Sequence, residues 1–326
     1  MEPVDRVRAA LALERPDRPP AGWWGHTYEA EWSARDLAGV TVRRQREHAW
    51  DFVKLQPRAC CFAQAFGAEY RPAVEFRDAP VPARPVVPGP GDWDRIPPVD
   101  ASAPSLREQV DALRLVVEQI GPSVPVIQTV FSPLTVAGYL VGEDKPRAAR
   151  ELRDRPEDVT PALERIGDAL AGFASASIAA GAAGVFYAIS GYASADVMSR
   201  EDYGRLALAN DRRVLEALPG AAWCNVLHLC GARVHFDLAS TLPAHAVSWS
   251  IHGPGNPSLA EGRDRSGRAA MGGLDHDRTM VEGTPSDVLA QRTAAVESTG
   301  GRGLLVAPGC SVPPEAPESN LRAVTV

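Results

Sequence analysis

The sequence predicts an α/β protein, a single (β/α)₈ TIM barrel that extends over residues 1–326. Three observations support this fold: eight short apolar or β-branched runs, a helical pattern after each run, and no linker-like stretch that divides the chain. Strands that alternate with helices pair in parallel, and eight repeats suit a closed barrel better than an open sheet.

Eight short runs are predicted to form the strands. They are PAGWWGH (20–26), WDFVKLQ (50–56), PVIQTVF (125–131), GVFYAIS (184–190), AWCNVLHLC (222–230), HAVSWS (245–250), AAMGGLD (269–275) and GLLVAPGC (303–310). Between them we expect helices over 28–48, 132–142, 145–153, 160–181, 201–218, 232–240, 258–265 and 285–298, and a last turn after residue 317.

Two stretches interrupt this alternation. Residues 57–100 predict a hairpin followed by an irregular, proline-rich insertion after strand two. Residues 105–120 have the spacing of an amphipathic helix that leads to strand three. Neither stretch has the character of an interdomain linker, because the barrel needs strands from both sides of it to close.

Charge and composition exclude several classes of function. The net charge is -7, and the 34 lysines and arginines are scattered, so we expect no nucleic-acid partner. The chain contains no apolar run of the length that a membrane helix needs and no secretory signal, so we expect a cytoplasmic protein without a membrane partner. Five cysteines, an odd number, argue against a disulfide framework and leave thiols for metal binding or catalysis.

The ends of two predicted strands carry residues that bind metals. His228 and Cys230 end strand five on the same face, and Cys310 ends strand eight. Active sites of such barrels lie at the carboxyl ends of the strands, and two thiols with one imidazole suit zinc with one position left open. The alternative is structural, since a buried cysteine is usually a small hydrophobic residue, as we interpret Cys224.

Other strand ends supply candidate residues for catalysis and substrate binding, although each type is also common in packing. The candidate catalytic residues are His26, Tyr187 and His252. The candidate substrate-binding residues are Trp23, Trp24, Gln128, Tyr192 and Trp249. Asp275 and His276 follow strand seven and could orient a substrate or a ligand.

Four segments resemble the uroporphyrinogen decarboxylase superfamily, which includes the decarboxylase of the haem pathway and zinc methyltransferases that act on methyl-corrinoids. They are QTVFSPLTVAGYLVG, ADVMSREDYGRLALANDRRVLEAL followed by HLCG, GGLDHDRTMVEGTPSDVLAQR, and APGCSVPPEAPESNLRAV. The resemblance extends over nearly the whole chain, and the final segment is the most specific to the superfamily.

Three departures favour the methyltransferase branch of that superfamily. The arginine-rich segment that decarboxylases carry after strand one is replaced by GWWGHTYEAEW, and their F-S-D-type segment by KLQPRACC. Their G-H-G-type turn after strand eight is replaced by Pro308-Gly309-Cys310. The methyltransferase branch resembles this chain in its H-x-C on strand five and its cysteine after strand eight, which implies that His228, Cys230 and Cys310 bind zinc.

The resemblance implies transfer of a methyl group to a zinc-bound thiol. The thiol could be coenzyme M, homocysteine or another small molecule, and the donor a methyl-corrinoid carried by a partner protein or another activated methyl donor. Two alternatives stay open. One is a metal-free carboxy-lyase that acts on a porphyrinogen, and the other is an inactive homologue that binds a corrinoid or a thiol.

Overall fold

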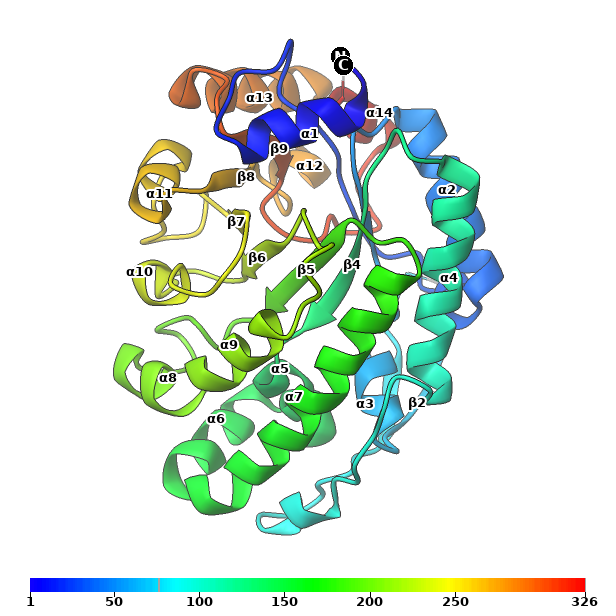
Figure 1. Ribbon diagram of the computed structural model, residues 1–326, viewed down its shortest axis with the longest axis vertical. Helices are drawn as coiled ribbons and strands as arrows, with labels where there is room; N and C mark the ends of the chain where they lie inside the picture. The colour runs from blue at the N-terminus through cyan, green and yellow to red at the C-terminus, as the bar shows by residue number, and fades with distance from the viewer. Residues whose placement is uncertain (76, 326) are drawn as a thin grey trace.

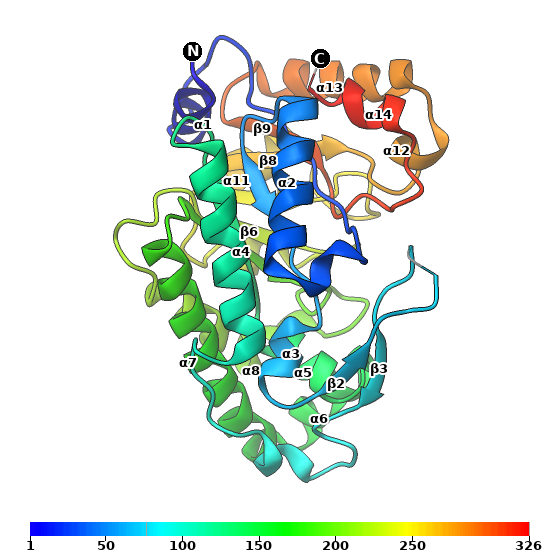
Figure 2. The same ribbon diagram turned by 90° about the vertical axis from the view of Figure 1, so that its right-hand side faces the viewer.

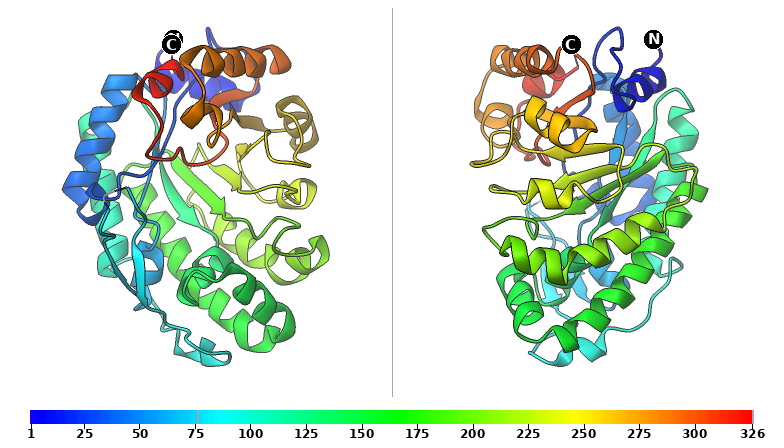
Figure 3. Two further views of the ribbon diagram at one scale, coloured as in Figure 1. Left: turned by 180° about the vertical axis from the view of Figure 1, so that it is seen from behind. Right: turned by 60° about the vertical axis from the view of Figure 1, so that its left-hand side comes forward.

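A strongly curled parallel sheet forms the centre of the computed structural model, which describes residues 1–75 and 77–325. Its seven strands follow the order β1-β4-β5-β6-β7-β8-β9, and helices surround them in a TIM-barrel-like arrangement (Figure 1, Figure 3). The strands are β1 (Val53–Leu55), β4 (Val126–Phe131), β5 (Gly184–Ile189), β6 (Val226–Leu229), β7 (Ala246–Trp249), β8 (Ala269–Leu274) and β9 (Leu304–Pro308). The α/β class and seven of the eight predicted strands are confirmed.

The first predicted strand, residues 20–26, is not a regular strand. It makes only isolated bridges, from Ala21 to Val306 and from Gly25 to Val312. The Gly22 N–H donates to Val306 O at 3.1 Å, and the Asp51 N–H donates to Ala21 O at 3.0 Å, so the segment lies between β9 and the start of β1. Because Pro20 has no N–H to donate, the ladder cannot continue toward the N-terminus.

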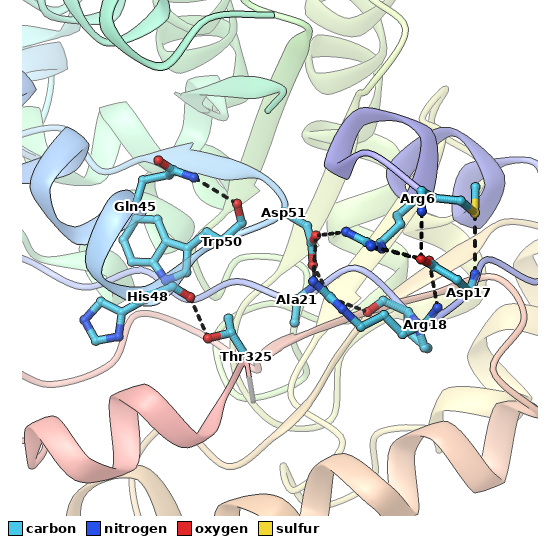
Figure 4. Close-up of polar contacts among 11 residues, drawn as sticks. Arg6, Asp17, Arg18, Ala21, Gln45, His48, Trp50, Asp51 and Thr325 are labelled. Carbon is cyan, nitrogen blue, oxygen red and sulfur yellow. Dashed lines mark hydrogen bonds and ion pairs between the residues drawn. The ribbon is translucent and has the colours of Figure 1, made fainter. Parts of the chain in front are cut away.

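A buried carboxylate holds this segment in place (Figure 4). The Asp51 side chain, 1% exposed, accepts a hydrogen bond from the Ala21 N–H at 2.9 Å. It also accepts hydrogen bonds from the side chains of Arg6 at 3.1 Å and Arg18 at 2.5 Å. At the other end of the chain, the Thr325 hydroxyl donates to His48 O at 2.6 Å. Both termini therefore lie at the same end of the molecule (Figure 1, Figure 2).

The helices cover the outside of the sheet, with α2 and α4 side by side (Figure 2). They are α1 (Pro3–Leu11), α2 (Ala34–His48), α3 (Cys61–Ala65), α4 (Pro104–Ile120), α5 (Pro133–Leu140), α6 (Lys145–Asp154), α7 (Pro156–Ala179), α8 (Arg200–Leu206), α9 (Leu208–Glu216), α10 (Phe236–Ala239), α11 (Leu259–Ser266), α12 (Thr279–Glu282), α13 (Pro285–Thr299) and α14 (Glu318–Ala323). Two short 3₁₀ turns, η1 (Ala30–Trp32) and η2 (Asp92–Arg95), complete the list.

Several predicted helices differ in extent. The helix expected from residue 28 begins at Ala34, because the Ser33 side chain accepts the Asp36 N–H and caps it. The helix expected over 201–218 is divided at Ala207 into α8 and α9, and the one expected over 232–240 is reduced to α10. Helix α1 was not predicted.

A small antiparallel sheet lies in the stretch between β1 and α4. It pairs β2 (Glu69–Arg71) with β3 (Val81–Arg84) and projects away from the main sheet (Figure 2). Further along, Trp93 of η2 is buried, and its Nε1 donates to Glu151 Oε2 of α6 at 2.6 Å. This bond ties the proline-rich segment to the body of the protein.

The alternation of side chains along each strand separates the sheet's interior from its helix-covered face. On β5, Phe186 faces the interior, where its ring stacks on His228 of β6, while Tyr187 turns outward to Asp211 of α9. The buried apolar side chains form one continuous cluster that includes both faces. Within the described residues, no helix is both long and apolar enough to span a membrane.

Candidate metal centre and the cavity beside it

Three potential metal ligands come together at the carboxyl edge of the sheet. His228 lies in β6, Cys230 follows that strand directly, and Cys310 follows β9. Their ligand atoms all lie within 4.8 Å of one another, and the Cys230 and Cys310 sulfurs are 3.8 Å apart. Residues that are 80 positions apart in sequence thus meet in one site.

This donor set fits a zinc ion in kind and in spacing. Two sulfurs bound tetrahedrally at about 2.3 Å from zinc would be about 3.8 Å apart, which matches the separation of the two cysteines. One nitrogen and two sulfurs are also ligands that zinc commonly takes, and three protein ligands leave a fourth position for a substrate.

Neighbouring side chains fix the orientation of His228. Its Nδ1 lies 3.1 Å from the Ser248 hydroxyl of β7, which leaves Nε2 for a metal. The Phe186 ring stacks on the imidazole at 4.9 Å between centroids, and Trp24 packs against Phe186 at 5.2 Å. A partner on the second ring nitrogen and an aromatic wall are typical of histidines that bind metals.

A glycine allows Cys310 to approach Cys230. A Cβ atom on Gly309 would lie 2.6 Å from Ser250 Cβ and 2.7 Å from Ser250 Cα. Real side chains do not come this close, so the turn after β9 can pass the end of β7 only with glycine at this position. The sequence pattern Ala-Pro-Gly-Cys is therefore a local requirement of the site.

The Cys230 and Cys310 side chains are hydrogen-bonded to each other. The hydrogen bond from Cys310, which outweighs burial, lowers the pKa of Cys230 to about 7. The same hydrogen bond and burial raise the pKa of Cys310 well above its ordinary range. The first thiolate to form is thus that of Cys230, with Cys310 as the donor beside it.

A cavity of about 420 Å³ opens beside the cysteine pair. Its lining includes Cys230, Cys310, His252, Asp275, His276 and Asp277. His252 is held by a contact of 3.2 Å between its Nε2 and Gly273 O. The predicted catalytic residue His252 and the two cysteines therefore face one common space.

The predicted catalytic residue His26 belongs to a chain of polar contacts that does not line the cavity. His26 contacts Glu31 through Nδ1 at 2.8 Å and Gln56 through Nε2 at 2.9 Å, and Gln56 in turn accepts a hydrogen bond from Lys54. Burial lowers the pKa of Lys54 to about 7, although electrostatic interaction with the Cys310 side chain opposes that shift. The Lys54 Nζ lies 5.0 Å from the centre of the Phe186 ring, which stacks on His228, so these polar contacts extend to the edge of the candidate metal centre.

Three predicted residues lie outside the sheet's interior, among the helices. Tyr187 donates to Asp211 Oδ1 at 2.8 Å, and Tyr203 donates to the other oxygen at 2.7 Å. Trp23 packs edge-on against Trp50 and His48, and Trp249 donates to Pro257 O at 2.8 Å. The structure does not bring these side chains to the cavity. Alternation turns Tyr187 and Trp249 to the outer faces of β5 and β7, and Trp23 packs against Trp50 and His48.

Two more predicted residues are buried away from the cavity. Gln128 is fully buried on β4, and its register beside Leu55 and Val185 places it on the face opposite Phe186. Tyr192 packs against α5, where its hydroxyl would lie 2.3 Å from a Cβ on Gly138. Of the five predicted substrate-binding residues, the structure brings Trp24 to the wall of the site.

Some residues of the site were not predicted. Ser248 and Lys54 are polar residues within otherwise apolar strands, a signal that was present in HAVSWS and FVKLQ. Asn256 lies in the loop after β7. Its amide donates to Gly231 O at 2.9 Å and to Ser250 O at 2.8 Å, and so it joins the loops after β6 and β7.

Comparison with known proteins gives a family and several relatives. The model of the uroporphyrinogen decarboxylase (URO-D) family matches residues 3–326. The chain is 25% identical to the methylcobamide:CoM methyltransferase MtaA of Methanosarcina barkeri, covering 99% of this chain and 93% of that protein. It is 24% identical to the methylcobamide:CoM methyltransferase MtbA of Methanosarcina mazei, covering 98% and 92%.

Solved structures share the fold at lower identity. A methyltransferase from Methanosarcina mazei superposes with a TM-score of 0.84 at 20% identity, over 99% of this chain and 97% of that one. A B12-independent methionine synthase from Shewanella sp. superposes with a TM-score of 0.61 at 16% identity, over 96% and 93%.

Proposed function

Because the chain belongs to the uroporphyrinogen decarboxylase family, we propose that it is a zinc-dependent methyltransferase that moves a methyl group from a methyl-corrinoid to a small-molecule thiol. The observation that carries the proposal is the convergence of His228, Cys230 and Cys310 beside a cavity. The similarity to two methylcobamide:CoM methyltransferases over nearly their whole lengths supports the choice of reaction.

Each residue of the site has a defined part in this proposal. His228, Cys230 and Cys310 hold the metal, and Ser248 keeps the imidazole oriented. Bound zinc would supply a Lewis-acidic position at which a thiol loses its proton more readily. Trp24 and Phe186 form an apolar wall that keeps water from the back of the site. His252 lines the cavity in which we expect the thiol to bind.

The corrinoid is expected to arrive on a partner protein. A cavity of about 420 Å³ suits a small thiol, whereas a corrinoid is far larger and has to be presented at the mouth. The thiol is coenzyme M, homocysteine or a related compound, and comparison of these acceptors identifies it.

Two measurements on one preparation test the proposal. Protein grown with zinc and never exposed to chelator is expected to hold one zinc per chain, and to transfer the methyl group of methylcobalamin to at least one thiol of a panel. Cys310→Ala should lose both properties. Cys224→Ala, which alters a buried cysteine away from the site, should keep both. Wild-type protein without stoichiometric metal would refute the proposal.

Activity assays on the same preparation distinguish a methyltransferase from a carboxy-lyase. Porphyrinogen decarboxylation that persists in Cys230→Ser would favour the lyase. Metal binding without methyl transfer to any thiol would instead indicate a binding protein that has lost activity.

A further inference from the structure

We propose that His276 takes the proton of the thiol substrate, with Asp277 behind it as the group that stabilises the resulting charge. The inference rests on the proposed function, since it requires a thiol that binds beside Cys230 and Cys310. It assigns a catalytic task to a residue outside the set of metal ligands.

The position of His276 is well defined. It follows β8 in a turn where Asp275 Oδ1 accepts the backbone N–H groups of Asp277 and Arg278, each at 3.2 Å. The Asp275 N–H itself donates to Gln291 Oε1 of α13 at 2.9 Å. This turn is anchored on both sides, and it presents His276 to the cavity that both cysteines line.

The two ring nitrogens of His276 have different surroundings. Nε2 lies 3.2 Å from Asp277 Oδ1, whereas Nδ1 is buried and has no hydrogen-bond partner among the described residues. A buried nitrogen without a partner costs free energy that a donor would recover. A carboxylate on one nitrogen and a free second nitrogen are the arrangement of a general base. His252 lines the same cavity but has a backbone carbonyl on its Nε2.

Burial keeps the His276 ring in the neutral form, which can accept a proton. Burial lowers its pKa, the nearby His228 and His252 act in the same direction, and Asp277 and Asp275 oppose the shift. The neutral ring is therefore the resting form at neutral pH. Once a proton arrives, the two carboxylates stabilise the imidazolium.

The step is balanced within the site. The S–H bond of the thiol breaks, its proton moves to Nδ1 of His276, and the electron pair stays on sulfur as a thiolate. That thiolate then attacks the methyl carbon of the methyl-corrinoid donor: the new sulfur–carbon bond forms while the carbon–cobalt bond breaks, and the electron pair of the broken bond stays with the corrinoid. Asp277 is 67% exposed, so the proton can pass from the imidazolium to water.

Stopped-flow absorption of the cobalt(II)-loaded protein with 2-mercaptoethanol tests the proposal without methyl transfer. A sulfur-to-cobalt band reports formation of the thiolate. At pH 7, His276→Gln should slow its appearance about 10-fold to 100-fold. This is at or below the lower limit of typical general-base effects, because a small fraction of the thiol is already ionised. Above the pKa of the thiol, the two rates should converge. Asp277→Asn should show a smaller loss, and the exposed control Asp264→Asn should show none.

Several results would overturn the inference. Equal rates at pH 7 for wild type and His276→Gln would do so, and so would a loss of the same size at every pH, which indicates a structural role. Loss of metal from His276→Gln would reassign the residue as a ligand. A His276-dependent band in a protein that never transfers a methyl group would refute the proposed function and leave this inference standing. The converse, methyl transfer with unchanged rates in His276→Gln, would refute the inference alone.

Discussion

The Cys230 and Cys310 sulfur atoms lie 3.8 Å apart, at the ends of two strands that are not neighbours in the sheet. This separation suits two ligands of one tetrahedral metal ion. Without the metal it is also short enough for a small movement to join the two sulfurs, since a disulfide requires about 2.05 Å between them. The two cysteines can therefore either bind a metal together or form a disulfide.

Removal of the metal should therefore expose the pair to oxidation. After treatment with a chelator and then diamide, the number of free thiols in unfolded protein should fall from five to three, and zinc should not rebind until a reductant is added. The zinc-loaded protein should keep all five. Thiol titration with mass spectrometry measures both. A disulfide that forms equally fast with the metal present would contradict the assignment of these cysteines as ligands.

The hydrogen bond between Ser248 and His228 should contribute to metal affinity. Removal of such a partner of a metal-binding histidine typically weakens metal binding about 10-fold to 100-fold, because the ring is no longer held in one orientation. We expect this loss for Ser248→Ala and a smaller one for Ser248→Thr, which keeps the hydroxyl. Competition with a chromophoric chelator measures the affinity. Unchanged affinity in Ser248→Ala would show that packing against Phe186 orients the ring.

The close approach at Gly309 predicts a large effect for a single methyl group. Gly309→Ala would place a Cβ 2.6 Å from Ser250 Cβ and should destabilise the fold by about 1–3 kcal/mol while it separates Cys310 from Cys230. Gly39→Ala provides the matched control, since the exposed Gly39 in α2 has nothing within 4 Å. There the same change should stabilise the protein by about 0.5–1 kcal/mol. Urea unfolding and metal content distinguish the two sites.

The pH dependence of stability should include a contribution from Asp211, away from the metal centre. Burial raises its pKa to about 7 in the folded protein, although hydrogen bonds from Tyr203 and Tyr187 oppose the shift. Since the unfolded chain releases this proton near pH 4, the contribution of Asp211 to stability is present below that pH and is lost as the pH rises to about 7. Relative to wild type, Asp211→Asn should gain up to about 1.4 kcal/mol per pH unit in this window. Urea unfolding at several pH values gives the difference, and a constant difference would mean that Asp211 is ionised in the folded state.

The sequence by itself determined the class of the fold and the chemistry of the candidate site. Periodicity and turn residues located seven strands and most helices, because both depend on neighbours along the chain. His228 and Cys230 could be placed on one face for the same reason, since they are two residues apart in one strand. Cys310 was predicted to join them from its place at another strand end. Zinc binding by the three residues stays a prediction.

Tertiary structure alone decided which aromatic and polar residues reach the site. Trp23 and Trp24 are adjacent and alike, yet only Trp24 points to Phe186, because the segment's position between β9 and β1 sets which face is inside. The same cause sends Tyr187 to Asp211, and the meeting of separate loops brings His276 to the cysteine cavity. The sequence pattern of a strand predicts which residues share a face. Only the closing of the curled sheet decides which face surrounds the site, since that depends on contacts between distant parts of the chain.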